Sequence, residues 1–306
     1  MHPALSIIVF TTLSGFGYGL AMVVASGLVV DPVSFGGRVG YVIALLAASG
    51  GLVSSTFHLG HPERAWRALS QWRTSWLSRE GVAAMVTFVP LGLAALGAVV
   101  FREDWRIAAL LSIPSALFTV YCTSMIYASL KTVAQWHTNW TPLVFVAFSL
   151  SSGTMAAAAL AAGGQALALL AILMLFVSAF AKTRWWARAS EAKGPSTIGT
   201  ATGLGDLGPV RLLERPHTEE NYLTREMGFR IARKHARKLR SMAMLLLWIA
   251  PTVLCVGAFW TGVGALPATL LLLALLSHLA GMLVERWLFF AEARHSVMLY
   301  YGDQTA

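Results

Sequence analysis

The segment from His58 to Glu80 concentrates side chains that can exchange protons and bind negative charge. It reads HLGHPERAWRALSQWRTSWLSRE and holds two His, two Glu, four Arg and three Trp between two long apolar runs. A connection that only reversed the direction of the chain would need none of these residues. At the edge of a bilayer, this mixture predicts proton-coupled chemistry at the boundary between water and lipid, together with docking of a partner.

Glu80 and His58 are the two candidates for proton transfer. Glu80 begins the third apolar run, so its carboxylate is expected at the membrane edge or just inside it. Ionisable groups at that depth are costly to bury and are commonly functional. His58 ends the second apolar run and could exchange a proton with an oxygen atom of a bound ligand. The alternatives are a Glu80 that only pairs with Arg79 or Arg73, and a His58 that only forms interfacial hydrogen bonds.

Metal and haem sites are both disfavoured by the positions of the possible ligands. His58 and His61 have an HxxH spacing, but no further ligand with matching geometry lies near them. A haem held by two imidazoles needs two facing histidines inside the bundle, and only His278 lies well inside an apolar run. Cys122 and Cys255 stand in separate apolar runs without a CxxC spacing. We expect neither a metal nor a haem in this chain.

Composition assigns the chain to a membrane. Hydrophobic residues make up 57% of its 306 residues and charged residues only 12%, about half the charged share of a soluble protein. Small residues such as Gly17 are expected where helices pack closely. The expected fold is an all-α bundle of eight transmembrane helices forming a single membrane domain over 1–306. Runs of the required length of about 20 residues lie at 4–30, 39–57, 81–101, 107–130, 142–162, 166–182, 242–263 and 267–290.

The net charge of +9 is distributed unevenly between the two faces of this bundle. All Lys and Arg residues except Arg38, Arg102 and Arg106 fall on one face. The positive-inside rule therefore places both termini, the His58–Glu80 joint and the long loop 183–241 in the cytoplasm. Anionic lipid headgroups account for this basic charge, so a nucleic acid partner is not expected.

The second half of the long loop predicts a helix. Thr218 can cap it, acidic residues follow in its first turn, and RIARKHARKLR closes it with cations, in accord with the helix dipole. We expect either a solvated helix against lipid headgroups or a docking surface for a partner.

Two further groups of residues are expected near the membrane edge or inside the bundle. Trp66, Trp72 and Trp76 predict an aromatic belt, and one of them could line an apolar slot for a ring. The adjacent charges Glu285 and Arg286 lie inside the eighth apolar run. They are expected to pair with each other or with groups at the interface.

Four segments of the sequence carry a resemblance to a known family: MHPALSIIVFTTLSGFGYGL, the His58–Glu80 joint, IYASLKTVAQWHTNWTP and ERWLFFAEARHSVMLYYG. With them, the chain resembles the dimethyl sulfoxide reductase anchor-subunit family over nearly its whole length. The resemblance implies eight transmembrane helices without haem, and a complex with a molybdopterin catalytic subunit and an iron–sulfur electron-transfer subunit. It implies that this chain binds a quinone, either ubiquinone or menaquinone, while the main substrate reacts in another subunit. It also implies that Glu80 and His58 take part in quinol binding and proton transfer.

The expected quinone site and docking surface gather polar and aromatic residues of one face. Trp136 and His137 precede the fifth apolar run on that face and could form a second wall of the pocket. The expected docking residues are Arg64, Arg67 and Arg73. The expected quinone-site residues are His58, His61, Arg64, Trp76, Arg79, Glu80, Trp136 and His137.

The charge distribution favours one branch of this family. Members that serve respiratory sulfoxide reduction have exported catalytic subunits, whereas the basic joint here is expected in the cytoplasm. That arrangement resembles the membrane subunit of sulfite-oxidising, quinone-reducing complexes in the bacterial cytoplasmic membrane. The ending ERWLFFAEARH is similar to that branch as well.

Two other functions remain alternatives. A multi-helix transporter of a small anion would often show matching broken helices in two halves, with its ionisable groups near the midplane. In this sequence no internal repeat is evident and the ionisable groups gather on one face. A purely structural anchor would co-purify without quinone, and its complex would be insensitive to inhibitors of quinone sites.

Overall fold

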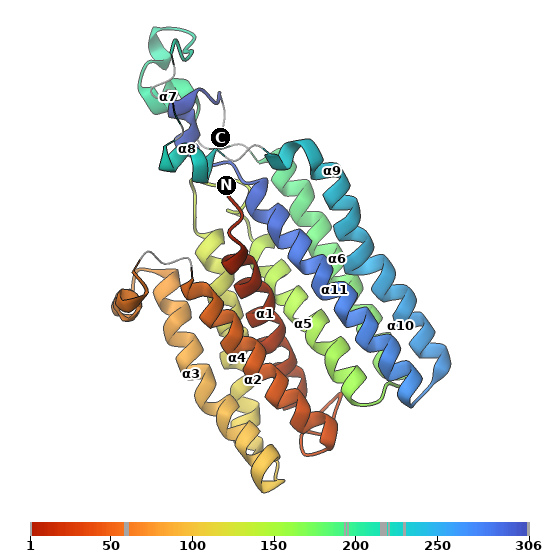
Figure 1. Cartoon of the computed structure of the whole chain (residues 1–306). Coiled ribbons are helices and arrows are strands. Elements are labelled where there is room, and N and C mark those ends of the chain that lie inside the picture. Colours follow the sequence, from red (N-terminus) through yellow and green to blue (C-terminus); the bar gives the residue numbers. More distant parts are fainter. Residues whose placement is uncertain are drawn as a thin grey trace.

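The protein is a bundle of long helices that run alongside one another, with both termini at the same end (Figure 1). Within the described residues, eight helices are long and apolar enough to cross a membrane. The all-α fold of eight transmembrane helices predicted from hydropathy is therefore confirmed. The computed structural model describes residues 2–57, 61–192, 194, 196–214, 219, 221–228 and 231–304.

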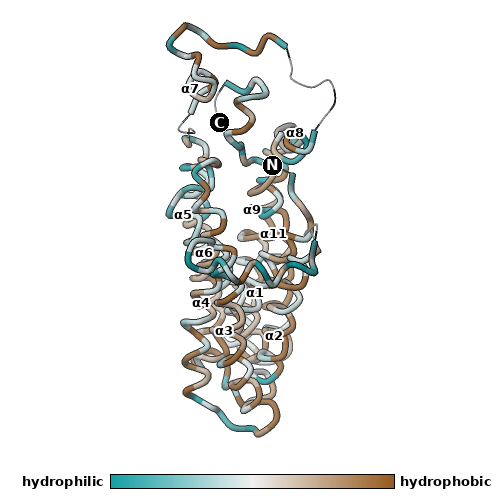
Figure 2. The backbone as a smooth tube through the Cα atoms, turned by 90° about the vertical axis from the view of Figure 1, so that its left-hand side faces the viewer, coloured by the Kyte–Doolittle hydropathy of each residue, from teal (hydrophilic) through white to brown (hydrophobic). Residues whose placement is uncertain are grey.

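The eight spans follow the order of the predicted apolar runs. Their hydrophobic residues are brown in Figure 2, and teal gathers in the segments that connect them. The seventh span is continuous from α9 through a π-helical turn, Leu245–Ile249, into α10. The helices are α1 Leu5–Ser26, α2 Phe35–Thr56, α3 Trp76–Leu96, α4 Arg106–Ala128, α5 Trp140–Leu160, α6 Gln165–Glu191, α9 Ile231–Met244, α10 Ala250–Thr261 and α11 Ala265–Ala291.

Two helices extend beyond their predicted ends into the charged connection. The sixth run was expected to end at residue 182, but α6 continues to Glu191, and α9 begins at Ile231 before the predicted start at 242. Most of RIARKHARKLR is therefore the first part of the seventh span and not a separate surface helix. Lys, Arg and Ala are strong helix formers, so the helices continue after hydropathy falls. The predicted cap Thr218 lies outside the described residues.

Close approach of small residues places α1 inside the bundle, in contact with α2, α4, α5 and α11. A Cβ atom on Gly17 would lie 2.5 Å from the backbone nitrogen of Ala48 in α2. A Cβ atom on Gly153 of α5 would lie 2.6 Å from the backbone nitrogen of Leu20. Only glycine allows backbones to meet at such distances, which confirms the packing role predicted for Gly17.

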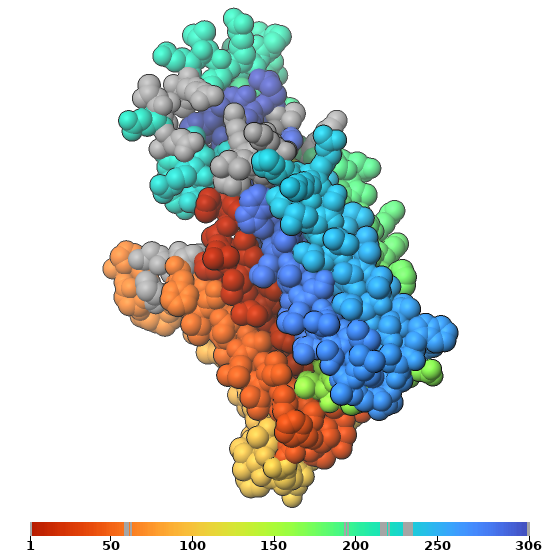
Figure 3. Space-filling model, turned by 45° about the vertical axis from the view of Figure 1, so that its right-hand side comes forward, coloured from red at the N-terminus to blue at the C-terminus, as the bar shows by residue number. Residues whose placement is uncertain are grey.

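The end of the bundle that carries both termini is called here the charged end. Three shorter helices and the C-terminal segment complete it. The joint forms a short helix, η1 Pro62–Gln71, which protrudes beside the ends of α2 and α3 (Figure 3). The C-terminal turn η5 Ser296–Tyr301 packs against α7 Ile198–Thr202 and α8 Tyr222–Met227. The hydroxyl of Tyr300 donates a hydrogen bond to the carbonyl oxygen of Ala201 at 3.0 Å.

Candidate functional site

Glu80 is a buried carboxylate one turn inside α3. Ser75 precedes the helix, and its side chain accepts a hydrogen bond from the backbone N–H of Ser78, which fixes where α3 begins. Glu80 is 5% exposed, and its Oε1 accepts a hydrogen bond from the Thr123 hydroxyl of α4 at 2.7 Å. The sequence-based expectation that Glu80 lies just inside the span agrees with this position.

Arg79 does not serve as the partner of Glu80, although the sequence left that pairing open. Its guanidinium donates to the carbonyl oxygens of Trp72 at 2.9 Å and of Arg73 at 2.6 Å. It also lies over the ring of Trp76, 4.3 Å from the centroid. Arg79 therefore fastens the joint to the start of α3, and the partner described for the Glu80 carboxylate is a neutral hydroxyl.

Two tyrosines are buried on α1 and α4, which pack against each other. One is Tyr18 of α1 and the other is Tyr127 of α4, and both are buried. The hydroxyl of Tyr18 has no hydrogen-bond partner among the described residues. A buried hydroxyl without a partner is free to donate to a ligand oxygen. Glu80 and Thr123 thus join α3 and α4 at one polar site, and the unpartnered Tyr18 hydroxyl belongs to α1, which packs against α4.

Hydroxyl groups continue from Glu80 toward the middle of the bundle. Thr123 lies within 3.1 Å of the carbonyl oxygen of Thr119, so its single proton can point to that oxygen or to Glu80. One turn deeper, the hydroxyls of Thr119 and Thr87 are 2.9 Å apart. Thr87 and Thr119 are fully buried between α3 and α4. The carboxylate is therefore the outermost member of a polar row inside an apolar bundle.

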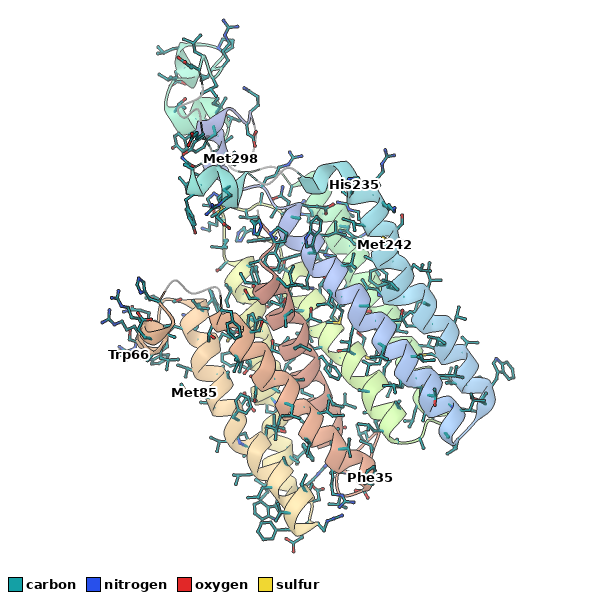
Figure 4. All side chains as sticks on the ribbon, in the orientation of Figure 1. Phe35, Trp66, Met85, His235, Met242 and Met298 are labelled. Atoms are coloured by element: carbon teal, nitrogen blue, oxygen red, sulfur yellow. The ribbon has the colours of Figure 1, made fainter. Side chains whose placement is uncertain are left out.

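The joint residues form a separate, exposed group. His61 hydrogen-bonds to Glu63 at 3.0 Å, and Arg64 lies 3.7 Å from the same carboxylate. Trp66 lies at the outer edge of the joint, away from the helices (Figure 4). The guanidinium of Arg67 lies over its ring, 5.6 Å from the centroid. These side chains are available to a partner or to lipid headgroups. The predicted residue His58 lies outside the described residues.

Arg73 and Trp76 lie in the part of the joint between η1 and Glu80. Arg73 lies over the exposed ring of Trp72, 5.4 Å from its centroid. Trp76 meets Tyr121 of α4 edge to face, with ring centroids 5.8 Å apart. This aromatic pair joins the first turn of α3 to α4, the two helices that hold Glu80 and Thr123.

Trp136 and His137 have structural contacts on the connection between α4 and α5. The Trp136 indole donates to the carbonyl oxygen of Phe289 at 2.9 Å and stacks on that ring at 5.1 Å. The Nδ1 atom of His137 lies 2.7 Å from the carbonyl oxygen of Ala128. Trp136 therefore packs against α11. Tyr127 connects the two regions, because it meets Trp136 edge to face at 5.4 Å.

A second buried polar group lies between α6 and α11. Glu285 pairs with Lys182 and, at 2.8 Å, with the Nε atom of Arg286, and all three side chains are at most 2% exposed. The pairing expected between Glu285 and Arg286 is confirmed. The sequence places Lys182 at the very end of the sixth apolar run and does not identify it as a partner of Glu285. The sixth apolar run, 166–182, is the shortest of the eight, and this short length is the sign that the helix continues past Lys182.

Aromatic rings surround the two cations of this group. The ammonium of Lys182 lies 3.5 Å from the ring centroid of Trp185, and the guanidinium of Arg286 lies 4.0 Å from that of Phe145. Such contacts stabilise cations that water cannot reach. A cavity of about 360 Å³ opens above the group at the charged end, lined by Trp185 and the partly exposed pair Arg240–Glu292. The charged end thus has a recessed polar surface.

The buried histidine considered for haem ligation is held by hydrogen bonds. Its Nε2 lies 2.9 Å from the Ser151 hydroxyl and its Nδ1 lies 2.7 Å from the carbonyl oxygen of Leu247. His278 therefore links α5 and α11 to the seventh span. In the part of the chain that the structure describes, no three His, Cys, Asp or Glu side chains are grouped in a way that could hold a metal ion.

Comparison with known proteins identifies the family. Residues 1–301 match the family model of the DMSO (dimethyl sulfoxide) reductase anchor subunit. The chain is 33% identical over 326 residues to a sulfite dehydrogenase subunit of Allochromatium vinosum, covering 98% of this chain and 99% of that protein. It is 33% identical over 113 residues to the anaerobic dimethyl sulfoxide reductase chain YnfH of Escherichia coli, covering 36% of this chain and 39% of that protein. The chain belongs to the dimethyl sulfoxide reductase anchor-subunit family.

Proposed function

We propose that this chain anchors a three-subunit molybdopterin oxidoreductase to the membrane and is the subunit in which quinone reacts. The partners are an iron–sulfur electron-transfer subunit and a molybdopterin catalytic subunit, which converts the main substrate. The observation that carries the proposal is Glu80, a membrane-embedded and buried carboxylate whose described hydrogen-bond partner is the neutral hydroxyl of Thr123. A proton-exchanging group at that depth is what quinone chemistry requires.

Glu80 is proposed to transfer a proton to the quinone, because iron–sulfur clusters carry electrons but no protons. Reduction of a quinone consumes two electrons and two protons, and iron–sulfur clusters pass electrons singly without protons. Thr123 holds Oε1 of Glu80, so Oε2 is the oxygen that can meet a ring oxygen. Tyr18 can donate a second hydrogen bond, and Trp76 with Tyr121 shields the site at the membrane edge. His58, which ends the second apolar run of the sequence, is proposed as the second proton-exchanging group.

The proposed quinone site contains fewer residues than the sequence predicted. Trp76 and Arg79 lie at the start of α3 next to Glu80, and we retain both as quinone-site residues. His61 and Arg64 are more exposed, and we place them at the entrance. Trp136 and His137 act from further away by fixing the packing around Tyr127. The ligand is proposed to be ubiquinone or menaquinone, with no haem and no metal in this chain.

The sulfite-oxidising branch is the proposed branch of the family. The sulfite dehydrogenase relative aligns over 98% of the chain, whereas the dimethyl sulfoxide reductase relative aligns over 36%. The concentration of Lys and Arg at the charged end favours a cytoplasmic position for that end and for both termini. We therefore propose quinone reduction coupled to sulfite oxidation in the cytoplasm of a bacterium.

Quinone content and inhibitor sensitivity test the proposal against a purely structural anchor. The complex extracted from membranes should contain bound quinone. Analogues that compete for quinone sites should block electron transfer from the substrate to quinone, yet leave transfer to a soluble mediator unchanged. A complex that contains no quinone and is insensitive to these analogues would contradict the proposal.

Reversing two charges on the joint should release the soluble subunits. Arg64 and Arg67 are exposed, and a docking role predicts that Arg64→Glu with Arg67→Glu moves most mediator-linked activity from membranes to the soluble fraction. The matched control is Arg102→Glu, at the opposite end of α3. Both variant anchors should remain in the membrane when tagged. Normal membrane retention of activity in the double variant would remove these two residues from docking.

A further inference from the structure

The hydroxyl of Thr123 has two acceptors within reach but only one proton. Its Oγ1 atom lies 2.7 Å from Oε1 of Glu80 and 3.1 Å from the carbonyl oxygen of Thr119. A threonine hydroxyl donates one hydrogen bond and can accept others. The two hydrogen bonds are therefore alternatives, and rotation about the C–O bond of Thr123 exchanges one for the other.

The spacing of polar residues along α3 and α4 brings these groups together. Glu80 and Thr87 are seven residues apart in α3, about two turns, and Thr119 and Thr123 are about one turn apart in α4. Each pair therefore lies on one face of its helix. The two faces meet, because Thr123 bonds to Glu80 and the hydroxyls of Thr87 and Thr119 are 2.9 Å apart. Thr123 is thus held between the two helices, where it is 5% exposed.

Each orientation of the Thr123 hydroxyl fits one charge of the carboxyl group. An ionised carboxylate only accepts hydrogen bonds, and the Thr123 proton then points to Oε1. A carboxyl group with its proton on Oε1 donates to the Thr123 oxygen, whose own proton then points to the carbonyl oxygen of Thr119. The contact between Glu80 and Thr123 therefore persists when Glu80 gains or loses a proton. In lipid this matters, because a buried polar group without a partner is costly.

We propose that Thr123 is a positioning residue for the quinone reaction. This inference rests on the proposed function and names the residue that lets Glu80 release and regain its proton. During quinone reduction, the O–H bond at Oε2 of Glu80 breaks and an O–H bond forms at a ring oxygen, while the electrons arrive from the iron–sulfur subunit. Thr123 donates to Oε1 throughout this step and stabilises the carboxylate that remains.

Replacing Thr123 by valine tests this role, because valine has nearly the same shape and no hydroxyl. Thr123→Val should lower the kcat for quinone about tenfold, the usual factor for a hydrogen bond to a charged group. The KM should stay within about twofold, because Thr123 acts on Glu80 and has no assigned contact with the ring. Thr123→Ser keeps the hydroxyl and should restore kcat to within about twofold of the wild type.

The matched control is Ser112→Ala, deeper in the same helix. Ser112 is fully buried, and its hydroxyl donates to the carbonyl oxygen of Ala109 at 2.7 Å, within α4. It lies eleven residues before Thr123, about 16 Å along the helix. Its kcat for quinone should equal that of the wild type. If Ser112→Ala and Thr123→Val lower kcat equally, the positioning role is overturned, because loss of any buried hydroxyl of α4 would have the same effect.

Infrared spectroscopy of the purified complex follows the same contact without turnover. The difference between the spectra of the wild type and Glu80→Gln, at a pH low enough to protonate Glu80, isolates the C=O band of this carboxyl group. Thr123→Val should move the band to higher wavenumber, because a carboxyl group that loses a hydrogen bond absorbs there. In Thr123→Ser the band should stay at the wild-type position.

The outcomes separate this inference from the proposed function. An unshifted band in Thr123→Val would overturn the contact between Thr123 and Glu80, whatever Glu80 does in the reaction. A shifted band with unchanged kcat would overturn the positioning role and leave the proposed quinone reaction standing. The loss of quinone-linked turnover in Glu80→Gln tests the proposed function separately. Mediator-linked activity confirms that each variant is folded and assembled.

Discussion

Glu80→Gln is expected to lower quinone-linked turnover by at least about 100-fold, the usual share of a general acid or base. Glutamine has nearly the same shape, and its carbonyl oxygen can still accept the hydrogen bond from Thr123. It cannot release or take up a proton. The measurement compares electron transfer from the substrate to quinone with transfer to a soluble mediator in the same membranes. Only the first rate should fall.

The control for this variant is Glu63→Gln. Glu63 is also a carboxylate of the joint region, but its side chain is 62% exposed and bonds to His61. It should leave quinone-linked turnover within about twofold of the wild type, as expected for an exposed residue outside the site. If Glu80→Gln behaves in the same way, Glu80 has no part in the mechanism.

Glu285→Gln is expected to cost the folded anchor about 3–5 kcal/mol, because it leaves the buried cations Lys182 and Arg286 without a carboxylate. Aromatic contacts alone do not replace that charge. Heating the purified complex and following the unfolding of the membrane part should therefore show a markedly lower midpoint. Replacing Glu285, Lys182 and Arg286 together by apolar residues of similar volume should restore much of the loss.

The control for Glu285→Gln is the same substitution in the partly exposed ion pair Arg240–Glu292. Its two hydrogen bonds are 3.0 and 2.9 Å long, but the Arg240 side chain is 42% exposed. Water screens such pairs, so Glu292→Gln should cost only about 0–1 kcal/mol. Equal midpoints for Glu285→Gln and the wild type would show that Glu285 does not neutralise the buried cations.

Hydropathy predicted the number and order of the spans but not where two of them end. Eight apolar runs match eight helices because each span must satisfy its own backbone hydrogen bonds in lipid. The misplaced ends, at α6 and α9, lie where the helix leaves the apolar layer. There the apolar signal stops while Ala, Arg and Lys continue to favour helix. For this reason the sequence places Lys182 at the end of the sixth span, although α6 continues to Glu191.

The candidate site was only partly predictable, because its members come from different helices. Glu80 could be selected from its position at the start of an apolar run. Its partner Thr123 is 43 residues away in an otherwise ordinary apolar helix, and Tyr18 comes from the first span. The periodicity of hydrophobic residues does not predict which helices will be neighbours. Lys182 and Glu285 illustrate the same limit, since the ion pair depends on the contact between α6 and α11.

A structure of the membrane-extracted complex with a bound quinone analogue tests the central claim most directly. We expect a ring oxygen within hydrogen-bond distance of the Glu80 carboxylate, with the iron–sulfur subunit seated on the charged end of the bundle. Glu80 still enclosed by Thr123, with the analogue bound between other helices, would contradict the account.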